Sequence, residues 1–147
     1  MFYQQQRVTF GEFSFQIPAK LCFDKNVNEQ FGESLFVYDL QEKYTFYFET
    51  DMPCFDLRHR GNQKYCSEEY TYAYERIRIN LCYPATHHEG RGCMVYFHAE
   101  LLDSNGDAHI LPGQMKIEFG NDWSAEAKRI LMELLRSVKI NDMKTAC

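Results

Sequence analysis

Four residues in positions 82–93 have side chains of the types that bind a metal ion: Cys82, His87, His88 and Cys93. Two thiolates and two imidazoles are the right kinds and number of ligands for tetrahedral zinc. The spacing argues against zinc, because four residues separate Cys82 from His87 and adjacent histidines on an extended chain point apart. The alternative is two buried thiols and two solvated histidines, with no cofactor bound. The sequence leaves both interpretations open.

A second group combines aromatic rings with guanidinium groups. Tyr70, Tyr72, Tyr74, Arg76 and Arg78 alternate along the chain, so they would line one face of an extended strand. Such a face suits a protein partner, a glycan or a phosphorylated ligand. The alternative is a sheet face that the protein covers with its own elements. The binding hypothesis therefore requires exposed tyrosine rings.

The sequence gives little support to catalysis. Cys54, His59 and Cys66 could supply a nucleophile and a base, but no third orienting group is evident. Phosphate-binding glycine loops, a nucleophile elbow and a helical metalloprotease pair are all missing from the sequence. We expect a non-enzymatic protein-binding or scaffold domain. The alternatives are a metal-dependent or thiol enzyme that uses residues 82–93, and a small-ligand or glycan-binding module that uses the aromatic and arginine face.

Composition limits the partners. The 147 residues correspond to one domain, which we expect to span residues 1–147. Acidic residues outnumber basic ones by 21 to 16, giving a net charge of −5, which argues against a general nucleic-acid or anionic-membrane binder. Aromatic residues make up 16% of the chain without a catalytic constellation to explain them. This favours a protein partner, which could be a second copy of the chain.

The segment that follows Met1 has neither the basic start nor the apolar stretch of a secretory signal. No apolar run approaches the roughly 20 residues that a membrane span needs. We therefore expect a cytoplasmic protein whose six cysteines are reduced thiols.

The first half of the chain is expected to form strands. Phe13, Phe15 and Ile17 alternate with polar residues, which is the period of a strand. The sequence predicts one strand over residues 7–17, a polar loop or short irregular helix over 24–33, a hairpin from 34–39 and 44–49, and an exposed connection over 51–67.

Residues 68–83 fit either a strand or a helix, and their Tyr, Thr and Ile content favours the strand. Residues 93–102 and 109–119 are expected to form a hairpin around Asn105-Gly106, because both residues accept the positive φ angles of a tight turn. Pro112 and Gly113 predict a break or bulge within the second of these strands.

The last element has the clearest pattern. Apolar residues from Trp123 to Val138 recur at helical spacing and form one continuous face, and Asp122 is in position to cap the helix. A helix over about 123–138 must cover something apolar. The sequence therefore predicts an α+β fold, with an antiparallel sheet of about six strands and this helix packed on one face.

Two segments resemble the PsbP-like family. Residues 13–18 (Phe-Ser-Phe-Gln-Ile-Pro) are similar to the opening strand of that family, and residues 127–140 are similar to its closing helix and short final strand. The resemblance implies an α/β/α sandwich that binds other proteins without catalysing a reaction. It implies no site residue. The family also has a helix between its early strands, for which only residues 24–33 are a candidate here.

Overall fold

The computed structural model describes residues 6–28, 30, 32–52, 56–59, 63–72, 75–84 and 92–141. Antiparallel strands dominate this part of the chain, with one α-helix and one 3-10 turn among them. The elements are β1 (Gln6–Phe10), β2 (Phe13–Ile17), β3 (Leu21–Asn28), β4 (Gly32–Asp39), β5 (Tyr44–Glu49), η1 (Leu57–His59), β6 (Gln63–Tyr72), β7 (Glu75–Pro84), β8 (Cys93–Leu102), β9 (Ala108–Ile117), α1 (Ala125–Arg136) and β10 (Lys139–Ile140).

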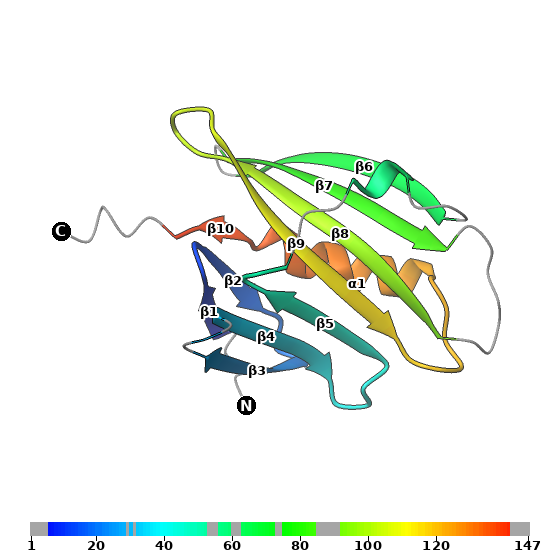
Figure 1. Cartoon of the computed structure of the whole chain (residues 1–147). Coiled ribbons are helices and arrows are strands. Elements are labelled where there is room, and N and C mark those ends of the chain that lie inside the picture. Colours follow the sequence, from blue (N-terminus) through cyan, green and yellow to red (C-terminus); the bar gives the residue numbers. More distant parts are fainter. Residues whose placement is uncertain are drawn as a thin grey trace.

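The main layer is a seven-stranded sheet with the order β3-β4-β5-β9-β8-β7-β6. Two antiparallel meanders, β3–β5 and β6–β9, meet where β9 pairs with β5. Helix α1 lies against one face of this sheet (Figure 1), which we call the inner face. The prediction of an antiparallel sheet with one covering helix is confirmed. The protein contains more sheet than expected, because the main sheet has seven strands and a second sheet has three.

The second sheet has the order β1-β2-β10 and lies beside α1 on the inner face. The phenyl ring of Phe15 in β2 is 5.0 Å from that of Phe48 in β5, measured between centroids, so the two sheets share one core. The prediction of a single strand over residues 7–17 is wrong. The chain reverses at Gly11, whose φ of 56° suits a residue without a Cβ, and β1 pairs back onto β2.

The prediction of a loop or irregular helix over residues 24–33 is also wrong. Strands β3 and β4 pair from Leu21↔Asp39 to Asn28↔Gly32 and occupy this segment. Many side chains of this segment are polar because β3 is an edge strand of the sheet and one of its faces is open to solvent. The expected hairpin that follows is confirmed as the β4–β5 pair.

The described residues of 68–83 are extended, and the prediction of strand over helix is confirmed. They do not form one strand. They belong to β6 and β7, which pair antiparallel from Gln63↔Pro84 to Tyr72↔Glu75. Tyr and Arg residues alternate without interruption from Tyr70 to Arg78 in the sequence, so this alternation does not indicate the reversal. Strand β6 also takes up the end of the predicted connection over residues 51–67.

The β8–β9 hairpin is confirmed, with Gly106 at a φ of 83° in its turn. The expected break at Pro112 and Gly113 is wrong, because β9 runs unbroken through both residues. Pairing of β5 with β9 ends at Tyr47↔Gln114, so no ladder hydrogen bond to β5 is required at Pro112. Gly113 is required by packing, since a Cβ there would lie 2.4 Å from ring atoms of Phe97.

Helix α1 is shorter than the predicted 123–138. It begins after the N-cap Ser124, whose hydroxyl accepts a hydrogen bond from the amide of Ala127, so the expected cap at Asp122 is wrong. Ala127, Leu131, Leu134 and Leu135 are fully buried against the core. The polar side of α1 faces away from these buried residues. It borders β6 of the main sheet, and the candidate site lies between the two.

Candidate functional site: a basic groove beside an edge strand

The predicted aromatic and arginine face is not formed as one surface. Residues that pair directly across two strands share a face of the sheet. Tyr70 pairs with Ile77 and lies on the inner face, whereas Arg78 pairs with Glu69 and lies with Arg76 on the outer face. Tyr72 pairs with Glu75 but its side chain is outside the described part of the structure, as is the whole of Tyr74.

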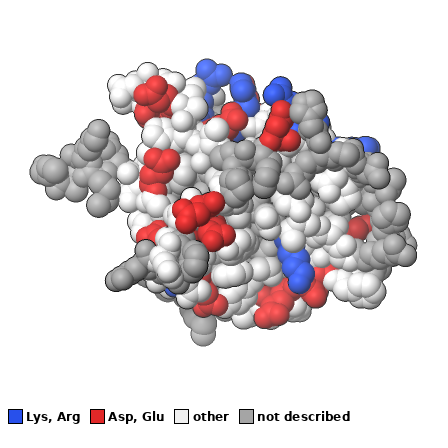
Figure 2. Space-filling view, viewed as in Figure 1, with Lys and Arg blue, Asp and Glu red and all other residues white. Residues whose placement is uncertain are grey.

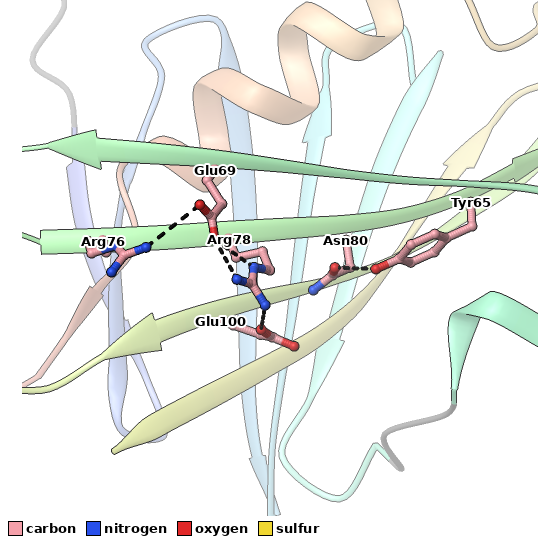
Figure 3. Close-up of polar contacts among 6 residues, drawn as sticks. All are labelled: Tyr65, Glu69, Arg76, Arg78, Asn80 and Glu100. Carbon is pink, nitrogen blue, oxygen red and sulfur yellow. Dashed lines mark hydrogen bonds and ion pairs between the residues drawn. The ribbon is translucent and has the colours of Figure 1, made fainter. Parts of the chain in front are cut away.

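The two arginines belong to an ion-pair cluster on the outer face (Figure 3). Glu69 accepts a hydrogen bond of 2.9 Å from Nε of Arg78 and lies 3.7 Å from the Arg76 guanidinium, and Glu100 lies 3.9 Å from Arg78. The hydrogen bond from Arg78 keeps the pKa of Glu69 below its ordinary value. Two arginines face two carboxylates, so the cluster carries no excess charge that would attract an anion.

The rest of the outer face carries few charges. Figure 2 views this face and shows wide areas without charged side chains. Phe36 and Tyr47 lie here with their ring centroids 4.8 Å apart, both half-buried. Tyr65 donates a hydrogen bond of 2.6 Å to Asn80, so its hydroxyl is already occupied.

The predicted metal ligands are only partly described. Cys82 pairs with Tyr96 on the outer face, is buried, and lies 3.0 Å from the amide oxygen of Gln63. Cys93 pairs with Ile117 on the inner face, where burial raises the pKa of its thiol. The two sulfurs therefore point away from each other, which does not favour one site that uses both.

His87 and His88 lie outside the described residues, so zinc at this loop stays a prediction. No group of three potential metal ligands occurs in the part of the chain that the structure describes. Cys54 and the His59 side chain are likewise not described. Cys22, Cys66, Cys82 and Cys93, the four cysteines that are described, are free thiols.

A groove of about 800 Å³ runs between α1, β6, β1 and β2. Tyr70 and Glu68 of β6 form one wall, and the half of α1 that carries Lys128, Met132 and Arg136 forms the other. Its charged lining consists of five basic residues and two acidic ones, namely Arg7, Lys128, Arg129, Arg136 and Lys139 against Glu68 and Glu133. The groove therefore has an excess of three positive charges in a chain whose net charge is −5.

Contacts across the groove join the helix to β6. Lys128 donates a hydrogen bond of 2.6 Å to Glu68, and the Tyr70 hydroxyl donates to the other oxygen of that carboxylate. The hydrogen bond from Lys128 lowers the pKa of Glu68, and the same bond raises the pKa of Lys128. The Arg136 guanidinium lies 4.4 Å from the centroid of the Tyr70 ring, within the range of a cation–π contact.

The remaining cations are less neutralised. Arg129 pairs with Glu133 at 3.6 Å, and Arg7 donates a hydrogen bond of 3.0 Å to the Ser14 hydroxyl. No carboxylate in the described ranges forms an ion pair with Arg7, Arg136 or Lys139. These three residues come from β1, α1 and β10, so only the folded chain brings their charges together.

The far end of the groove is held by Ser137, which follows α1. Its hydroxyl accepts a hydrogen bond of 3.0 Å from the Gln16 amide and approaches the carbonyl oxygens of Gln16 and Leu134. The end of the helix is thus tied to β2. The helical spacing of the sequence puts Lys128 and Arg136 on the side of α1 opposite its apolar residues. It could not show that this face looks toward β6.

No described helix is both long and apolar enough to cross a membrane. Comparisons with family models, curated proteins and solved structures find no match to this chain. The resemblance of the two terminal segments to the PsbP-like family therefore stays a prediction.

Proposed function

We propose that the chain is a non-enzymatic protein-binding domain that holds an acidic segment of its partner in the groove between α1 and β6. The observation that supports this is the excess of three positive charges within a volume of about 800 Å³, in a protein that is otherwise negative. A concave basic surface attracts carboxylates and speeds their association, especially at low ionic strength.

The shape and lining of the groove favour a peptide segment. Arg7, Arg136 and Lys139 line the groove from three separate elements, and no one element holds its positive charge. The Tyr70 ring and the Met132 side chain add apolar contact area between the charged groups. The net charge is −5 for the whole chain and +3 for the groove, so the rest of the chain carries −8, since −5 − 3 = −8; this disfavours an extended polyanion such as a nucleic acid, because most of its length would be repelled.

The test compares two double variants. Arg136→Gln with Lys139→Gln removes two charges from the groove, and Arg76→Gln with Lys116→Gln removes two from the outer face. Both change the net charge from −5 to −7, since −5 − 2 = −7, so long-range repulsion of an acidic probe is matched. The probe is a fluorescent peptide of about eight residues in which Glu alternates with Thr, a length that suits an extended segment.

We expect the groove variant to bind this peptide about tenfold more weakly by fluorescence anisotropy, equivalent to about 1.4 kcal/mol. The outer-face variant should bind as the unchanged protein does, and added salt should weaken both. Equal losses in the two variants, or no binding of the peptide by the unchanged protein at low salt, would overturn the proposal.

A further inference from the structure

Strand β6 is an edge strand, and it borders the groove. It is the last strand of the seven-stranded sheet and pairs with β7 on one side; no other described strand pairs with it. At ten residues it is longer than the usual five or six. A long free edge presents unpaired backbone N–H and C=O groups, which can accept another strand.

The faces of β6 connect this edge to the groove. Glu68 and Tyr70 point from β6 into the groove, whereas Glu69 points to the outer face. A strand added beside β6 would continue the pleat of the sheet, so every second side chain would point to the groove side. Carboxylates at those alternate positions would approach the cations on α1 and β10.

The charges of β6 do not prevent this arrangement. Glu68 is held by Lys128, and Glu69 is held by Arg78 and Arg76, so both carboxylates already have cationic partners. A second copy of the chain is a poorer occupant. On the groove side a second β6 strand would offer Lys64, Cys66, Glu68 and Tyr70, of which only Glu68 is acidic, so it would bring one carboxylate to the cations instead of several.

We propose that the groove binds its acidic segment as an extended strand, which pairs with the free edge of β6 and places acidic side chains at alternate positions toward α1. This inference rests on the proposed function and adds the binding mode to it. The backbone hydrogen bonds would supply affinity, and the alternating carboxylates would supply specificity. A strand of about eight residues would cover roughly 26 Å, most of the length of β6.

The experiment uses the full chain and three forms of the same peptide: the alternating Glu/Thr peptide, and two N-methylated derivatives that block either the odd or the even backbone amides. In an antiparallel ladder, alternate residues of an edge strand direct their N–H groups to the neighbouring strand. We expect one derivative to bind about tenfold more weakly, while the other binds nearly as the parent does. Hydrogen exchange of the β6 amides should slow when the parent peptide is present.

The outcomes separate this inference from the proposed function. If both derivatives bind like the parent and protection appears on α1 but not on β6, the groove binds acidic peptides in another way and strand addition is wrong. If no form of the peptide binds, the proposed function itself fails. A concentration-dependent dimer whose formation displaces the peptide and protects the β6 amides would show that a second copy occupies the edge, contrary to the inference.

Discussion

The two faces of the β6–β7 hairpin each carry a glutamate of β6 but differ in their electrostatics. On the outer face, Arg76 and Arg78 are matched by Glu69 and Glu100. On the inner face, the carboxylate of Glu68 faces a groove that also carries cations from α1, β1 and β10, and an excess of positive charge remains in the groove. Glu68 and Glu69 are neighbours in the sequence. The comparison teaches that a one-residue step along a strand separates a neutral cluster from a candidate binding site.

The largest effect is expected from a substitution in the core that supports the groove. Leu131 is fully buried on the side of α1 that faces the sheet. Leu131→Ala should lower the free energy of unfolding by about 2–5 kcal/mol, because it removes apolar contacts and leaves a cavity. Chemical denaturation measures this, with Leu40→Ala as the control, since Leu40 is 83% exposed. Equal stability of the two variants would contradict the packing of α1.

A second substitution tests the sheet that both faces share. A Cβ on Gly113 would lie 2.4 Å from the Phe97 ring and 2.9 Å from that of Phe48. Gly113→Ala should destabilise the protein by about 1–3 kcal/mol, because the two rings must leave their positions. The combination with Phe97→Leu, which makes room at that site, should recover part of the loss in thermal unfolding. Additive losses in the double variant would argue against the contact.

A pair of neighbouring substitutions sharpens the comparison directly. Glu68→Gln breaks the partly exposed ion pair with Lys128 and should cost about 0.2–1 kcal/mol, a range discounted for solvent screening. It also increases the positive charge of the groove, so acidic peptide should bind more tightly. Glu69→Gln changes the net charge equally but acts on the outer face, and it should leave peptide binding nearly unchanged. The two faces would not be independent if both variants bound the peptide alike.

The contribution of Glu68 to the stability of the folded protein depends on pH in a direction that its pKa shift defines. Its pKa in the folded protein is lowered from 4.5, chiefly by the hydrogen bond from Lys128. Its contribution to stability is therefore present above 4.5 and is lost as the pH falls through the lowered value. Denaturation of Glu68→Gln should accordingly differ from that of the unchanged protein at neutral pH and converge with it in acid.

The smallest effect concerns ion pairs of His109 in β9, outside the β6–β7 hairpin. His109 lies 3.0 Å from Glu12 in the β1–β2 turn and 2.8 Å from Asp103, which raise its pKa above 6.5. The contribution of His109 to stability is therefore fully present below pH 6.5 and is lost as the pH rises through the raised pKa. His109→Gln should remove this loss from the pH profile of thermal unfolding and leave peptide binding unaltered. An unchanged profile would show that the contact does not tie the turn to the β8–β9 hairpin.

Several elements could be predicted because their signals are local. The apolar spacing of α1 fixes one helix face, and Asn105-Gly106 permits the positive φ angles of the β8–β9 turn. The reversal at Gly11 was missed although the apolar positions change phase there, from Val8 and Phe10 to Phe13 and Phe15. The reversal between β6 and β7 was missed because the alternation of Tyr and Arg continues across it in the sequence. Gly113 was wrongly predicted to break the strand because the need for glycine there comes from residues far away in the sequence. The rings of Phe97 and Phe48 occupy the space that a side chain would need.

Almost none of the candidate site could be predicted from the sequence. Tyr70 was a predicted binding residue and lines the groove, but its expected neighbours Arg76 and Arg78 lie on the other face. A strand that reverses through a short connection inverts which alternate residues share a face, so Tyr70 aligns with Ile77 instead of Arg78. Its actual cationic neighbour is Arg136, which is 66 positions further along the chain.

The sequence by itself determined the sheet-rich composition, the amphipathic C-terminal helix and the negative net charge, because each depends on residue type and short spacing. Only the tertiary structure decided which strands lie at the edges, which face each side chain takes and where positive charge accumulates. The physical reason is that pairing and packing join residues such as Arg7, Arg136 and Lys139 across long separations, and no local pattern encodes their proximity.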